Sequence, residues 1–187
     1  MTKVVADISI SLDGFVAGPD HEVEALHTWA LEPDAIDAEV LDEGVDVTGV
    51  VVMGRRLFDI VDAPDGWNDE MGYGAGRAAQ PPLLVVTRTP PAEVRLAERT
   101  TFIVDGIGSA ISKGVAMSDD RDVVVMGGGR TVRTAIEEGV VDELRLHLAP
   151  VLLGGGTPLF TGAAPRSLRQ IHVRASSHAT HLTYRLD

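Results

Sequence analysis

The sequence predicts a single α/β domain whose sheet is mostly parallel and ends in an antiparallel hairpin. Up to residue 138, short apolar runs alternate with stretches of helical spacing, which is typical of parallel strands with helices on both faces. Beyond that point apolar and polar residues alternate, as in ELRLHL, which is typical of antiparallel strands. The length of 187 residues and the lack of a biased linker predict one domain over residues 1–187.

Each element is predicted from a local pattern. Strands are expected at residues 3–10, 48–53, 83–87, 101–105, 122–126, 143–153, 169–174 and 179–186. Helices are expected at 21–31, at 34–43 with Asp34 as N-cap, from residue 54, and at 111–117 and 129–138. Residues 62–82 are rich in Pro, Gly, Asp and Asn, which predicts a long loop.

Composition excludes several classes of function. The formal net charge is −12, which disfavours nucleic acid and anionic membranes as partners. There is no cysteine, so disulfides, thiolate metal sites and cysteine nucleophiles are excluded. The first residues lack a signal-peptide pattern and no apolar run approaches the ~20 residues of a membrane span, so we expect a cytoplasmic protein.

The segment VVVMGGGRTVRTAIEEG, residues 123–139, has an unusual order of charges. Arg130 and Arg133 lie in the first turn of the expected helix, whereas Glu137 and Glu138 lie in the last. A helix is partly positive at its N-terminus, so these arginines are unfavourable there unless an anion neutralises them. Glycines after a buried strand also let the backbone approach a ligand. The segment therefore predicts an anion site.

Two other predicted strands also end in arginines. VVVMGRR ends at Arg55 and Arg56, and LLVVTR ends at Arg88. Because the carboxyl ends of parallel strands line one edge of a sheet, the three loops predict a ligand with several phosphates. Val132 breaks the GxGxxG fingerprint and no GxxxxGK[ST] motif is present, so an ordinary dinucleotide fold and a P-loop NTPase are both excluded.

The segments SLDGFVAG, VVMGRRLFD, VVTR, VVVMGGGR and DELRLHLAPVLLGGGTPLF occur in an order that resembles the dihydrofolate reductase superfamily. The resemblance covers residues 3–186 and is to the branch related to the reductase domain of riboflavin biosynthesis. It implies a dihydrofolate-reductase-like three-layer sandwich around a central mixed sheet. It also implies an NADPH-dependent reductase, which transfers a hydride to a C=N or C=O bond of a small pterin- or pyrimidine-like heterocycle.

The resemblance also implies which residues bind NADPH. The backbone of Ala6 and the loop 13–18 would flank the nicotinamide. Three groups of residues would hold the phosphates: Gly54, Arg55 and Arg56 along the chain of phosphates, Thr87 and Arg88 at the 2′-phosphate, and Gly127, Gly128, Gly129, Arg130 and Thr131 at the pyrophosphate.

Candidates on the substrate side are fewer. Asp13 is either a turn residue or a group that transfers a proton. Phe15, Trp29 and Trp67 either wall a planar substrate or belong to the core, and Gly155 either lets the backbone approach the substrate or turns the chain. Dihydrofolate reductases bind the pterin through an acid on the helix that precedes the MGR strand, and the acids on that helix here are Asp34, Asp37, Glu39 and Asp42.

The remaining predictions concern metals, partners and alternatives. His178 and His181 are expected on opposite faces of a strand, and His147 at a solvated or dimeric surface, so no metal site is expected. The alternating tail predicts a homodimer. Two alternatives to the NADPH reductase stay open: a non-catalytic nucleotide-binding or sensor protein, and a deazaflavin-dependent reductase on the same fold.

Overall fold

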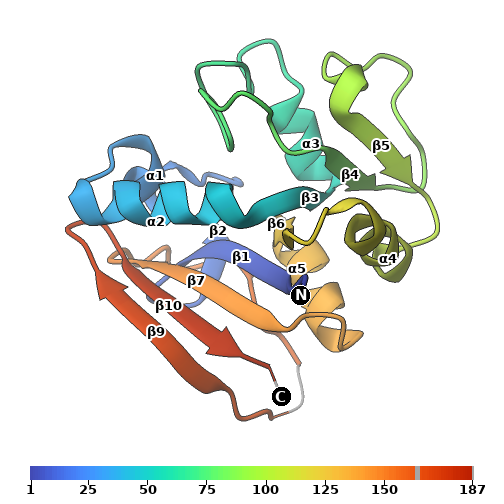
Figure 1. Cartoon of the computed structure of the whole chain (residues 1–187). Coiled ribbons are helices and arrows are strands. Elements are labelled where there is room, and N and C mark those ends of the chain that lie inside the picture. Colours follow the sequence, from blue (N-terminus) through green and yellow to red (C-terminus); the bar gives the residue numbers. More distant parts are fainter. Residues whose placement is uncertain (163–164, 187) are drawn as a thin grey trace.

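One mixed sheet of eight strands organises the chain (Figure 1). The computed structural model describes residues 1–162 and 165–186. The strand order is β5-β4-β3-β6-β1-β7-β10-β9, and β2 and β8 form a separate pair. The bounds are β1 Val4–Ser11, β2 Phe15–Ala17, β3 Thr48–Gly54, β4 Leu83–Val86, β5 Thr100–Ile103, β6 Asp122–Met126, β7 Glu143–Ala149, β8 Thr157–Pro158, β9 Arg169–Ala175 and β10 Thr180–Arg185.

The sheet is parallel from β5 to β7 and antiparallel from β7 to β9. This confirms the predicted mixed sheet with a C-terminal hairpin. The helices are α1 Thr28–Leu31, α2 Ala35–Val47, α3 Arg55–Val61, α4 Ile107–Met117 and α5 Gly129–Glu137, with 3-10 turns at Glu24–Leu26 and Ala97–Arg99. Among the described residues, no helix combines the length and the apolar character needed to cross a membrane.

The two faces of the sheet differ in chemistry. On one face α5 packs on the apolar side of β1 and α4 packs on β3 and β4, and Ala6, Ile8 and Ile10 join the main core there. On the other face the alternate residues of β1 are polar, and Asp7, Ser9 and Ser11 point toward the α2 side. A smaller apolar cluster around Phe58 covers that face at β3 and β4. The sheet therefore has a polar interior under α2.

The sheet opens beside the end of β1. β1 pairs with β6 only over Val4–Asp7, whereas it pairs with β7 from Val5 to Ser11. The two connections at this place run in opposite directions across the sheet. The chain passes from β1 through α2 to β3, which lies beyond β6, and from β6 through α5 to β7, which lies on the other side of β1. Such a reversal of strand order leaves a crevice at the carboxyl edge, where ligands bind in open α/β sheets.

Three predicted elements were wrong in extent. Residues 21–31 do not form one helix, because a 3-10 turn and the four-residue α1 meet at His27 so that Leu26 and Trp29 can both be buried. β7 stops at Ala149, since Pro150 cannot donate a ladder hydrogen bond. α4 begins at Ile107, earlier than predicted, directly after Gly106 with a φ of 95°.

The β2–β8 pair closes the loop after β1. Gly156, just before β8, has a φ of 119°, and a Cβ there would overlap the carbonyl oxygen of Ala17 in β2. Val16 of β2 in turn packs toward α5, because a Cβ at Gly129 would lie 2.7 Å from Val16 Cγ2. The small sheet thus fixes the loop 13–18 against the start of α5.

Candidate functional site

Three unpaired arginines lie on adjacent loops at the carboxyl edge of the sheet. Arg56 follows β3, Arg88 follows β4 and Arg130 follows β6, and these strands are neighbours in the order β4-β3-β6. All three side chains are exposed. Within residues 1–162 and 165–186 none of them forms an ion pair, although the protein is strongly acidic. The edge therefore offers three free cations to an anionic ligand.

Arg55 has a different role from its neighbour Arg56. Its Nε donates to Asp59 Oδ1 over 2.6 Å, and its Nη1 donates to the carbonyl oxygen of Thr89 over 2.8 Å. These bonds tie the start of α3 to the loop after β4. The same loop is ordered by Thr87, whose hydroxyl accepts from the backbone N–H of Thr89 over 3.2 Å. Arg55 and Thr87 thus position the loop that carries Arg88.

The glycine loop after β6 has the backbone that an anion site requires. Gly127 and Gly128 have φ values of 57° and 70°, a left-handed conformation that other residues rarely adopt. Within the described part of the chain no side chain caps the start of α5, so the N–H groups of Gly129 and Arg130 remain available to a ligand. A Cβ at Gly54 would overlap Thr131 Oγ1, so β3 and α5 approach closely here. These residues fit a cofactor with several phosphates.

Asp13 connects two loops beside this edge of the sheet. Its carboxylate accepts from Ser11 Oγ over 2.6 Å and from the backbone N–H groups of Leu153 and Gly154 over 3.1 and 2.7 Å. The hydrogen bond from Ser11 is the main cause that lowers the pKa of Asp13. A carboxylate that remains ionised and holds two loops together matches the turn role better than proton transfer.

The aromatic candidates are dispersed. Trp29 is only 6% exposed, stacks on His147 with ring centroids 3.9 Å apart, and donates from Nε1 to Ser9 Oγ. Trp67 instead joins the cluster around Phe58 and stacks on Tyr73. Phe15 lies half-buried in β2, and Gly155 lies beside Pro19 of the neighbouring loop. Trp29 and Trp67 therefore belong to separate packed regions, while Phe15 lies within the loop 13–18 and Gly155 lies beside the residue that follows it.

A buried chain of ionisable side chains lies under α2, and the sequence did not predict it. His147 Nε2 is 2.9 Å from Asp7 Oδ1, His147 Nδ1 is 2.7 Å from His181 Nδ1, and His181 Nε2 is 2.8 Å from Asp37 Oδ1. His178 Nδ1 lies 3.0 Å from the other oxygen of Asp37. The surface position predicted for His147 was wrong, since it is only 4% exposed. The prediction that His178 and His181 lie on opposite faces of a strand was wrong, because His178 lies in the turn before β10 and both histidines contact Asp37.

The ionisation of this chain follows from its surroundings. Burial raises the pKa of Asp7, but the interactions with His147, Arg145 and His181 together outweigh burial, so the pKa of Asp7 is lowered. The pKa of Asp37 is also lowered, since hydrogen bonds, including that from His181, outweigh burial. Burial lowers the pKa of His181. Both carboxylates are therefore ionised near neutral pH.

Asp34, Asp37 and His178 lie close enough to suggest a metal, with one ligand atom of each within 4.8 Å of the others. Helix capping explains the group. Asp34 accepts from the N–H groups of Ile36, Asp37 and Ser177, which holds the pKa of Asp34 at about 2. Asp37 completes the capping box by accepting from the N–H of Asp34.

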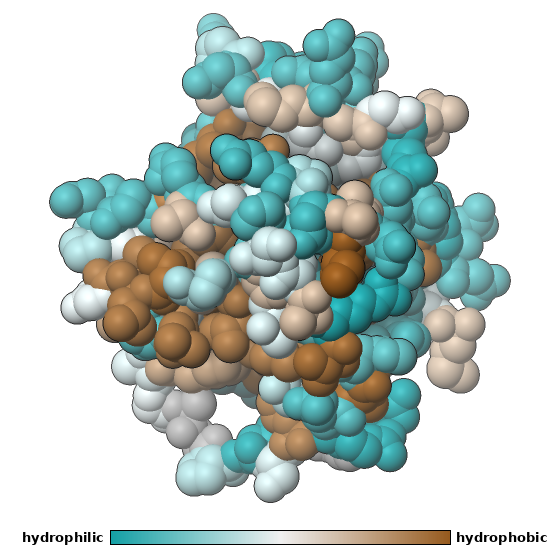
Figure 2. Space-filling view, turned by 90° about the vertical axis from the view of Figure 1, so that its left-hand side faces the viewer, coloured by the Kyte–Doolittle hydropathy of each residue, from teal (hydrophilic) through white to brown (hydrophobic). Residues whose placement is uncertain are grey.

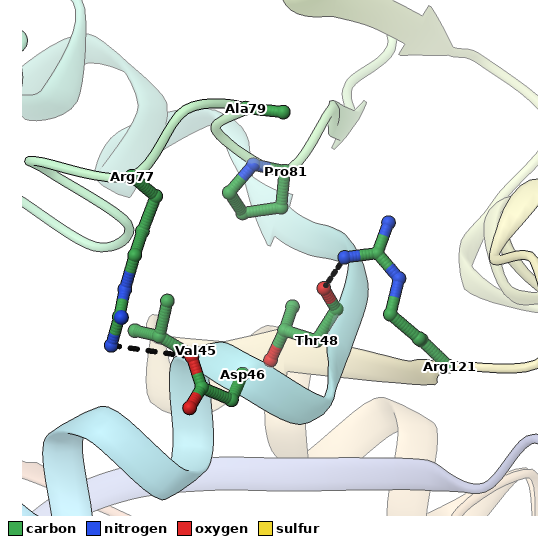
Figure 3. Close-up of a pocket in the computed structure, with 7 residues that line it drawn as sticks. All are labelled: Val45, Asp46, Thr48, Arg77, Ala79, Pro81 and Arg121. Carbon is green, nitrogen blue, oxygen red and sulfur yellow. Dashed lines mark hydrogen bonds and ion pairs between the residues drawn. The ribbon is translucent and has the colours of Figure 1, made fainter.

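A pocket of about 130 Å³ lies at the opposite, amino edge of the sheet (Figure 3). Arg77 and Arg121 line it from two sides, and both are already engaged. Arg77 pairs with Asp42 and Asp46 over 2.7 and 3.3 Å, and Arg121 donates to the carbonyl oxygen of Thr48 over 3.1 Å. The free arginines thus lie at the edge where β1 and β6 part, away from this pocket.

Comparisons with known proteins agree with this architecture. A family model described as RibD C-terminal domain matches residues 2–182. The uncharacterised protein YyaP of Bacillus subtilis (strain 168) is 26% identical over 183 residues, which cover 94% of this chain and 89% of YyaP.

Two solved structures share the fold. A candidate riboflavin biosynthesis protein from Shewanella sp. PV-4 superposes with a TM-score of 0.73 at 22% identity, covering 100% of this chain and 99% of the other. The Thermotoga maritima diaminohydroxyphosphoribosylaminopyrimidine deaminase/5-amino-6-(5-phosphoribosylamino)uracil reductase gives a TM-score of 0.66 at 15% identity, covering 100% of this chain and 57% of that one. At these identities the structures establish the fold alone, and they confirm the predicted reductase-like α/β architecture.

Proposed function

We propose, since this chain belongs to the RibD C-terminal domain family, that it is an NADPH-dependent reductase. Its substrate would be a small pyrimidine- or pterin-like heterocycle, reduced at a C=N or C=O bond. The observation that carries the proposal is a set of three exposed arginines on adjacent strand ends, which form no ion pair with any described residue, next to a left-handed glycine loop and the start of α5. A cofactor with three phosphates would neutralise these cations.

Each loop would hold one part of the cofactor. Arg88, held in place through Arg55 and Thr87, would bind the 2′-phosphate that distinguishes NADPH from NADH. Arg56, Arg130 and the loop Gly127–Gly128 would bind the pyrophosphate. The bound cofactor would supply the hydride, and the crevice beside Ala6 would orient the nicotinamide and exclude water.

Replacing Arg88 should separate the two cofactors. We expect Arg88→Ala to weaken NADPH binding about 10- to 100-fold, since a charge-assisted contact with a phosphate is lost, and to leave NADH binding unchanged. Calorimetric titration of both cofactors would measure this. Arg169→Ala is the matched control, because Arg169 is an exposed arginine on β9, at the far edge of the sheet. Equal losses for NADPH and NADH would contradict the assignment of Arg88.

The titration also separates the alternatives. No binding of either cofactor to the wild-type protein would reject the NADPH reductase, and binding of a deazaflavin cofactor instead would support the deazaflavin enzyme. If NADPH binds, 5-amino-6-(5-phosphoribosylamino)uracil is the first substrate probe, with NADPH oxidation followed by absorbance. Binding without oxidation across pyrimidine and pterin probes would support the non-catalytic sensor.

We also propose that the protein is a homodimer. β9 is an edge strand, and its Val173 is 50% exposed. Apolar side chains also gather on one face of the molecule (Figure 2). An unpaired strand edge and an exposed apolar surface both favour association with a second copy. Light scattering should give about twice the chain mass of 19.8 kDa, and the mass of a single chain would contradict the proposal.

A further inference from the structure

The three contacts of the buried chain from Asp7 to Asp37 can all be hydrogen bonds only if this chain holds one proton more than its separate groups would hold. If both carboxylates are ionised and both imidazoles are neutral, each ring carries one N–H. Each ring must use that N–H at Nε2 to donate to its carboxylate, at 2.9 and 2.8 Å. Two bare Nδ1 atoms would then face each other at 2.7 Å. That contact is a hydrogen bond only if a third proton lies between the rings.

The two rings have different surroundings. His147 lies beside the ionised Asp7 and stacks on Trp29 with ring centroids 3.9 Å apart. Burial lowers the pKa of His181, which favours its neutral form as the acceptor. Other charged or ionisable groups face the chain from every surrounding element: Arg145 on β7, Asp122 on β6, Tyr73 in the loop 62–82, His27 before α1, Asp34 at the start of α2, and the Arg174–Glu43 pair of β9 and α2.

The buried chain of ionisable side chains connects solvent with the crevice. At one end the His178 side chain is 30% exposed in the turn before β10, and at the other end Asp7 is 16% exposed. Between them Asp37, His181 and His147 are 6% exposed or less. Asp7 is also the last residue of β1 that pairs with β6, so it lies where the sheet opens. Its Oδ2 accepts no hydrogen bond from the described residues.

From this geometry we propose that His178, Asp37, His181, His147 and Asp7 form a proton path that delivers a proton to the crevice. The delivery step rests on the proposed reductase function. In that reaction the hydride, with both its electrons, comes from the bound cofactor, and the nitrogen or oxygen of the reduced bond takes one proton. Asp7 supplies that proton after receiving it from His147 Nε2, and a proton entering from solvent at His178 restores the original count.

The test needs no substrate. In the full-length protein, ¹H–¹⁵N NMR of the histidine rings should show three ring N–H protons on His147 and His181 together at pH 7.5. Their shared proton should exchange with D₂O faster than the backbone amides of Ile8 and Leu146, which are in the same region. His178→Asn keeps a donor to Asp37 but cannot relay a proton, so it should slow this exchange at least 10-fold. His172→Asn, which changes an exposed histidine on β9, should leave the exchange unchanged.

Each contrary outcome rejects a defined part of the proposal. Two outcomes would mean that the buried side chains only stabilise the fold and do not conduct protons. One is the detection of only two ring protons on His147 and His181, and the other is exchange in His178→Asn at the wild-type rate. Accelerated exchange at the reference amides would reveal unfolding of a variant, and His178→Gln would then replace His178→Asn. Saturating NADPH should shift the His147 Nε2–H resonance and not that of His172. Bound NADPH without this shift would reject the crevice end, whereas failure of NADPH to bind rejects the proposed function and leaves the apo-protein result intact.

Discussion

Asp37→Ala is expected to lower the free energy of unfolding by about 3–5 kcal/mol, because each buried donor left without its charged acceptor costs about 1–3 kcal/mol. Asp37 is fully buried, and it is the only buried residue of α2, all of which the structure describes. Its carboxylate accepts from His181, His178 and the N–H of Asp34. The variant would leave these donors without an acceptor and would break the capping box.

Urea unfolding followed by circular dichroism at pH 7 would measure this loss. Asp42→Ala is the matched control on the same helix, because Asp42 pairs with Arg77 while its side chain is 74% exposed. An exposed ion pair contributes only about 0–1 kcal/mol, so the control should be nearly as stable as the wild type. If both variants lost the same amount, α2 would not depend on the buried carboxylate.

Gly156→Ala is expected to destabilise the protein by about 2–4 kcal/mol, because strain and overlap act together. The φ of 119° disfavours any side chain at this position, and the new Cβ would overlap the carbonyl oxygen of Ala17. Neither backbone can move without separating β2 from β8. We expect the loop 13–18 to lose its hydrogen-exchange protection before the rest of the sheet does.

Gly154→Ala separates the two causes. Gly154 also has a positive φ, 70°, but a Cβ there would meet nothing within 4 Å. Only the backbone strain applies, so the loss should be about 1–2 kcal/mol. Thermal unfolding of both variants, with exchange of the loop amides, would measure the difference. An equal loss in the two variants would show that the contact with Ala17 is not limiting.

Local patterns predicted most of the sheet and the cationic edge. Buried strands such as TGVVVM and DVVVM are apolar runs that are too short for a helix of ordinary length, and each run is followed by glycine. The arginines after them could be assigned to one edge because parallel strands share their carboxyl side. The extent of α1 could not be predicted, since the burial of Leu26 and Trp29 by the rest of the fold decides it.

The polar chain under α2 could not be found from local patterns. Asp7 and His147 are 140 residues apart, and His181 and Asp37 are 144 apart, so they meet only because β1, β7 and β10 are neighbours. Periodicity specifies which face a residue occupies, not which strands lie side by side. One signal was available: Asp7, Ser9 and Ser11 make one face of β1 polar, which in a central strand implies a polar interior.

The central place of β1 in the sheet also bears on how the protein is made. Val4 pairs with Val123 and Val5 with Glu143, so both neighbours of β1 lie beyond residue 120. During synthesis the apolar segment VVADISIS therefore leaves the ribosome long before either of its partner strands and stays unpaired until they follow. Closing such long loops is slow, and unpaired strand edges in the waiting chain promote aggregation. The middle of the sheet is thus expected to form late, and nascent chains of this protein should depend on chaperones until β7 has emerged.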